Sequence, residues 1–75
     1  MKKVYLVHGS EDGTLGIYSN VKNAYARASG YRDEGDDSKV ESYAKVCKRL
    51  RLFGHADVVD SNYATSQIEM FYLNQ

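Results

Sequence analysis

Residues 38–54 form the segment that most constrains the fold, because its start, its periodicity and its end all predict a helix. Ser38 followed by Glu41 has the spacing of a capping box, in which each side chain satisfies a backbone amide of the first turn. Gly54 is the residue type that commonly ends a helix. At about 100° per residue one arc is mostly apolar, so one side of the helix should face the core. This inner arc contains Val40, Tyr43, Ala44, Val46, Cys47, Leu50 and Phe53.

The opposite arc of this helix carries most of its positive charge. A Glu41–Lys45 pair at i,i+4 is typical of a solvated helix surface, which is the simplest interpretation of the charges. Leu52, however, places an apolar side chain among arginines, a mixture that is typical of protein interfaces. We therefore hypothesise a partner-binding surface. Its residues are Lys45, Lys48, Arg49 and Leu52, with Arg51 and His55 at the C-terminal margin.

Length and composition limit the classes of protein to consider. The 75 residues make a single domain, 1–75, and an apolar content of 43% is enough for a folded core. Ten basic and ten acidic residues cancel, so no overall field attracts nucleic acid or an anionic membrane. One cysteine excludes an internal disulfide, and without a signal peptide we expect a cytoplasmic protein. No apolar run approaches the roughly 18 residues that a membrane span needs.

The N-terminal part of the chain predicts a β-hairpin. Residues 2–8 are a dense run of β-forming residues, which we expect to be buried on both faces of a sheet. A turn at 10–13 leads to a second short strand at 14–19. Gly16 lies within this second strand and indicates a bulge or a close packing contact.

A shorter helix and an acidic segment follow the hairpin. Ser19 or Asn20 can cap this helix, which ends near Gly30. Residues 31–37 are acidic, and we expect a solvated loop because they lack the alternating ligand positions of a calcium-binding loop. We predict no metal there. The apolar face of the short helix contains Val21, Ala24, Tyr25 and Ala28.

The C-terminal part predicts a second hairpin, with strands at 55–60 and 63–73. In the last strand Phe71 and Leu73 point to the face opposite the core. Because this face is partly apolar, a homodimer formed through strand or sheet contacts is plausible. The order ββααββ predicts an α+β domain, a small antiparallel sheet of two hairpins packed on one face by both helices. The core-facing residues of the last strand are Ile68, Met70 and Tyr72.

The residue types needed for catalysis do not form a convincing set. His8 and His55 are the only side chains that titrate near neutral pH without help from their surroundings. A nucleophile would need Cys47 beside one of them, yet Cys47 falls on the inner arc, where a thiol is usually inert. Residues 9–16 contain glycines but lack the ending of a phosphate-binding loop. We predict no catalytic residue, no metal, no cofactor and no enzymatic activity.

Several stretches resemble the small accessory proteins encoded by tailed bacteriophages, many of them uncharacterised. They are VYLVHG at 4–9, GIYS at 16–19 leading to AY at 24–25, SYAKVCKRL at 42–50 and IEMFYLN at 68–74. Such proteins often bind and disable, or redirect, one bacterial protein, including components of defence systems. The resemblance therefore implies a virus–host interaction in the host cytoplasm, and it implies no catalytic residue.

Two functional hypotheses result from the sequence. The first is a non-catalytic protein that binds and modulates or inhibits a bacterial protein. The alternative is a small nucleic-acid-binding regulator that uses the basic helix 38–54. The first is favoured because the cations are not interleaved with exposed aromatic residues and the net charge is zero.

Overall fold

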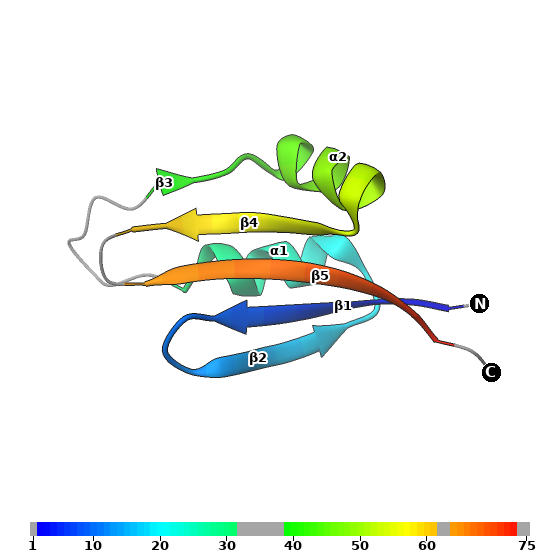
Figure 1. Ribbon diagram of the computed structural model, residues 1–75, viewed down its shortest axis with the longest axis horizontal. Helices are drawn as coiled ribbons and strands as arrows, with labels where there is room; N and C mark the ends of the chain where they lie inside the picture. The colour runs from blue at the N-terminus through cyan, green and yellow to red at the C-terminus, as the bar shows by residue number, and fades with distance from the viewer. Residues whose placement is uncertain (1, 32–38, 62–63, 74–75) are drawn as a thin grey trace.

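The computed structural model describes residues 2–31, 39–61 and 64–73, which form one antiparallel sheet of five strands and two helices (Figure 1). In chain order the elements are β1 (Lys2–Gly9), β2 (Gly13–Tyr18), α1 (Val21–Ser29), β3 (Lys39–Val40), α2 (Tyr43–Phe53), β4 (His55–Asp60) and β5 (Thr65–Leu73). The strands are arranged across the sheet as β2-β1-β5-β4-β3. The prediction of an α+β domain with an antiparallel sheet is confirmed. The predicted order ββααββ is wrong, because β3 lies between the two helices.

The start of α2 differs from the prediction because β4 competes for the residues before it. The Glu41 amide donates a hydrogen bond to the Val58 carbonyl at 2.8 Å, so Glu41 lies outside the helix. Ser42 is the N-cap, and its hydroxyl accepts a hydrogen bond from the Lys45 amide at 3.3 Å. The capping box at Ser38 and Glu41 is therefore wrong, and Ser38 itself lies outside the described residues.

The end of α2 is as the sequence predicts. Gly54 adopts the left-handed conformation, with a φ of 81°, which a residue without a side chain reaches at little cost. Its amide donates to the Leu50 carbonyl at 2.9 Å and closes the last turn. The chain then enters β4 directly at His55.

The helix α1 covers one face of the sheet and lies behind it in Figure 1. Asn20 caps it, since the side-chain oxygen accepts a hydrogen bond from the Asn23 amide at 2.8 Å. Ala24 and Ala28 are fully buried against the sheet, and such small side chains allow helix and sheet to approach closely. The predicted inner face of this helix is confirmed.

The helix α2 packs mainly against β4. The short β3 pairs only with Val59 and Asp60, so α2 occupies the edge of the sheet that β3 leaves open (Figure 1). Only Val46 and Leu50 of α2 are buried, because a helix at a sheet edge contacts the core through a narrow stripe. The wider inner arc of the sequence prediction is wrong for the exposed side chains Tyr43, Ala44 and Phe53. The buried cluster consists of Val7, Ala24, Ala28, Val46, Leu50, Ala56, Val58, Val59 and Ile68.

The other face of the sheet is covered by neither helix. Strand β1, which we expected to be buried on both faces, has Val7 sealed on the helix side while Val4 and Leu6 are only half-buried on the opposite side. The strand partners of these two residues on the open face are Phe71 and Ile17. Alternation along the strands therefore divides the sheet into a sealed face and an open face.

Two predictions about glycine-containing turns and strands are confirmed. Gly13 in the β1–β2 turn has a φ of 72°, a conformation that favours glycine. At Gly16 the register with β1 shifts by one residue, as a bulge requires, and the ring of Tyr18 lies so close that a Cβ there would be 2.9 Å from it.

Candidate partner-binding surface

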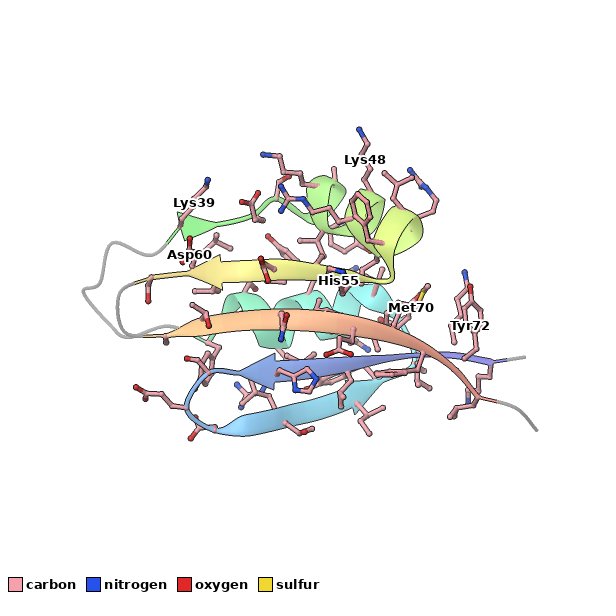
Figure 2. All side chains as sticks on the ribbon, in the orientation of Figure 1. Lys39, Lys48, His55, Asp60, Met70 and Tyr72 are labelled. Atoms are coloured by element: carbon pink, nitrogen blue, oxygen red, sulfur yellow. The ribbon has the colours of Figure 1, made fainter. Side chains whose placement is uncertain are left out.

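The helical part of the predicted surface is brought together by the periodicity of α2. Lys45, Lys48, Arg49 and Leu52 are spaced at i, i+3, i+4 and i+7, which places them on one side of the helix. Lys48 points away from the rest of the molecule (Figure 2). Arg49 is half-buried, whereas the other three side chains are exposed. The predicted outer arc of this helix is therefore present in the structure.

Glu41 gathers several of the nearby cations. Its carboxylate lies 3.5 Å from Lys45 Nζ, 3.8 Å from Arg49 Nη1 and 3.8 Å from Lys39 Nζ. The Glu41 side chain is 14% exposed, so it holds a negative charge at the base of the basic surface. Because the distances are long and the cations are partly or largely exposed, these ion pairs contribute about 0–1 kcal/mol each. Their main effect is to neutralise part of the positive patch.

An exposed apolar pair completes this surface. Leu52 is 59% exposed and Phe53 is 66% exposed, and they are adjacent in the last turn of α2. The Phe53 ring lies 6.3 Å from the His55 ring, centroid to centroid, which joins the end of α2 to the start of β4. We call Lys45, Lys48, Arg49, Leu52, Phe53 and His55 the α2 surface.

Phe53 is a member of this surface that the sequence analysis assigned to the core. Its helical angle does not separate it from the core residues, because at about 100° per residue Phe53 lies only about 20° from Val46, which is fully buried. Phe53 faces solvent because α2 lies at the edge of the sheet, a feature that the sequence of the helix does not reveal.

Arg51 is separated from the other predicted residues. It is exposed on the side of α2 where Cys47 and Leu50 line a cavity with the ends of β1 and β5. His55, by contrast, lies near the α2 surface, on the open face of the sheet beside Phe53. The six predicted residues thus form one surface except for Arg51.

Cys47 is less buried than the sequence predicts. Its thiol is half-buried and lines the same cavity as Arg51. A hydrogen bond to Cys47, together with desolvation, raises the pKa of the Tyr43 hydroxyl above its ordinary value. His8 lies on the opposite face of the sheet from this thiol, so these two side chains form no nucleophile–base pair.

His8 and Glu69 form a polar contact on the open face. His8 Nε2 lies 3.2 Å from Glu69 Oε1, yet this buried nitrogen makes no hydrogen bond of good geometry within the described residues. His55 is the β4 partner of Glu69 in the sheet.

Within residues 2–31, 39–61 and 64–73, no group of three acidic, histidine or cysteine side chains could hold a metal ion. The acidic segment 31–37, except Tyr31, lies outside these residues.

No protein-family model, curated protein or solved structure matches the chain. Neither helix of the described part of the chain is long and apolar enough to cross a membrane.

Proposed function

We propose that this protein is a non-catalytic binding domain that uses the α2 surface to bind and modulate, or inhibit, a bacterial protein. The observation that supports the proposal is the adjacent, exposed pair Leu52 and Phe53 among cationic side chains. Aromatic residues and Arg are enriched in protein interfaces, where a few of them near the centre carry most of the binding energy. The partner surface should therefore offer an apolar recess.

The exposure of Phe53 follows a pattern that holds for the aromatic residues of this protein. Every tyrosine and phenylalanine in the described residues is half-buried or exposed, and the buried cluster contains only aliphatic side chains. Single exposed apolar residues are normal on a monomer, whereas here two consecutive large side chains in one turn are each more than half exposed. The chain therefore keeps aromatic area at its surface, where a partner can bury it.

The charges near α2 support a protein partner over nucleic acid. Glu41 pairs with Lys45 and Arg49, and Asp57 and Asp60 line a shallow depression together with Arg49. These carboxylates would repel phosphates at the point where the basic helix would have to meet them. The resemblance to accessory proteins of tailed phages adds a class of target, a bacterial host or defence protein in the cytoplasm.

The proposal is tested by capture from a bacterial lysate with matched variants. Leu52→Ala combined with Phe53→Ala removes the apolar pair, while Ile17→Ala changes a side chain that is 65% exposed on the far strand β2. We expect the double variant to lose at least about tenfold of a protein that wild type and Ile17→Ala retain equally. Retention unchanged by the double variant would contradict the proposal. Retention that falls steeply with salt and is unaffected by the Leu52→Ala change would indicate that the partner is nucleic acid instead.

A further inference from the structure

A second concave site lies on the helix side of the sheet, at the end where the chain termini emerge. It is a cavity of about 180 Å³ between the start of α1, the inner side of α2 and the adjoining ends of β1 and β5. Met70 and Tyr72 extend from β5 on the side of α2 at this end (Figure 2). The cavity is separate from the α2 surface, since Arg51 and Cys47 line it and Leu52 and Phe53 do not.

The charges around this cavity are of one sign. Lys3 and Arg51 line it, and its lining contains no aspartate or glutamate. Neither cation has a carboxylate partner among the described residues, whereas Lys39, Lys45 and Arg49 all lie near Glu41. The Lys3 ammonium is held 5.8 Å from the centre of the Tyr72 ring, which fixes it at the rim. Two unpaired cations at one opening favour an anionic ligand, and a guanidinium suits a carboxylate.

Apolar side chains form one part of the cavity wall, beside the cationic rim. Val21, Leu50 and Met70 contribute aliphatic walls, and Tyr5 and Tyr72 contribute rings. An engineered protein cavity of about 150 Å³ is known to hold benzene, so about 180 Å³ accepts one six-membered ring with a short substituent. We infer that this cavity binds a small aromatic carboxylate, with the ring between Leu50 and Met70 and the carboxylate at Lys3 and Arg51. This site goes beyond the proposed protein-binding function and does not depend on it.

The position of Cys47 provides a direct measure of occupancy. It is the single cysteine of the chain, it is half-buried, and it lines this cavity. A ligand in the cavity should shield the thiol from a small alkylating reagent. Met70 gives a second readout that does not require a reactive thiol, because the NMR signal of its methyl group should move when a ring packs beside it.

The test uses phenylacetate as the probe and the whole, unmodified chain. A ligand with so few atoms should bind with a dissociation constant on the order of 1 mM. At about 10 mM phenylacetate we expect alkylation of Cys47 to slow about tenfold, by mass action, and the Met70 methyl signal to shift. Phenylacetamide, which has the ring without the charge, should protect at least about fivefold less well.

Three variants localise the anion. Arg51→Gln and Lys3→Gln should each weaken phenylacetate binding several-fold, measured by the Met70 shift. Arg49→Gln is the matched control, because Arg49 lies near Glu41 and does not line the cavity. The inference is overturned if phenylacetate at about 10 mM changes neither readout, if phenylacetamide binds equally well, or if Arg49→Gln weakens binding as much as Arg51→Gln.

Discussion

The two faces of the central sheet are built from alternate residues of the same strands, yet they differ in what covers them. On the face toward α1, Val7 and Ile68 are fully buried and face each other across β1 and β5. On the open face, Leu6 pairs with Ile17, and Phe71 remains 44% exposed. On both faces the residues that share a side are those that alternate along each strand in the sequence. Apolar alternation thus predicts which residues share a face, but the helices decide which face becomes the core.

The comparison also shows how the open face remains ordered without a cover. Val4 and Phe71 are direct cross-strand partners, and so are Leu6 and Ile17. Such pairs contribute about 0.2–1 kcal/mol each, which is enough to order side chains but far less than core burial. Equal truncations on the two faces should therefore have unequal effects on stability.

The largest expected effect comes from truncation on the sealed face. Ile68→Ala should lower the free energy of unfolding by about 2–5 kcal/mol, because it leaves a cavity in the centre of the core. A chain of 75 residues is stable by only about 4–11 kcal/mol, so this variant should be close to unfolded. Phe71→Ala on the same strand should cost under about 1 kcal/mol. Urea denaturation compares the two, and equal losses would refute the distinction between the faces.

A smaller effect is expected where the sealed face ends, at Gly9. A Cβ at Gly9 would lie 2.5 Å from Cζ of Tyr31, whose hydroxyl also accepts a hydrogen bond from the Glu11 amide at 3.1 Å. Gly9→Ala must displace this ring, and we expect a loss of about 1–3 kcal/mol in urea denaturation. Combining it with Tyr31→Ala should cost less than the sum of the single changes, because the clash is then absent. Simple additivity would show that the two residues do not interact.

The smallest effect on stability, and a distinct effect on assembly, is expected on the open face. We propose that the protein forms a homodimer through this face, where the side chains of Phe71 and Leu73 are both more than 40% exposed. Phe71→Ser should then weaken self-association at least about tenfold in sedimentation experiments while changing stability by under about 1 kcal/mol. A wild-type chain that stays monomeric at high concentration would remove the open face as a dimer interface.

Local signals account for the parts of the fold that could be predicted from the sequence. The glycine turn at Gly13, the α1 face around Ala24 and Ala28, and the helix end at Gly54 each depend on residues within one turn. The alternation of β5 was predictable for the same reason, since Ile68 is buried and Phe71 is exposed on opposite faces. These features are encoded within a few residues.

The features that were not predictable depend on partners distant in the chain. The capping box at Glu41 is locally reasonable, but the hydrogen bond from its amide to the Val58 carbonyl belongs to the sheet and requires β4. The exposure of Phe53 and the half-burial of Cys47 depend on α2 lying at the edge of the sheet. The position of Lys45, Lys48, Arg49 and Leu52 on one helix side was predictable, and so was the separation of Arg51, which at about 100° per residue lies about 40° from Cys47.

The central claim is that the Leu52–Phe53 pair, and not the basic charge of α2 alone, binds the partner. The most direct measurement is the dissociation rate of the captured protein from wild type, from Leu52→Ala with Phe53→Ala, and from Ile17→Ala, at low and moderate salt. We expect the double variant to dissociate at least about tenfold faster, which corresponds to about 1.4 kcal/mol, with Ile17→Ala unchanged and only mild dependence on salt. Unchanged dissociation of a folded double variant would contradict the claim and leave α2 with a purely structural role.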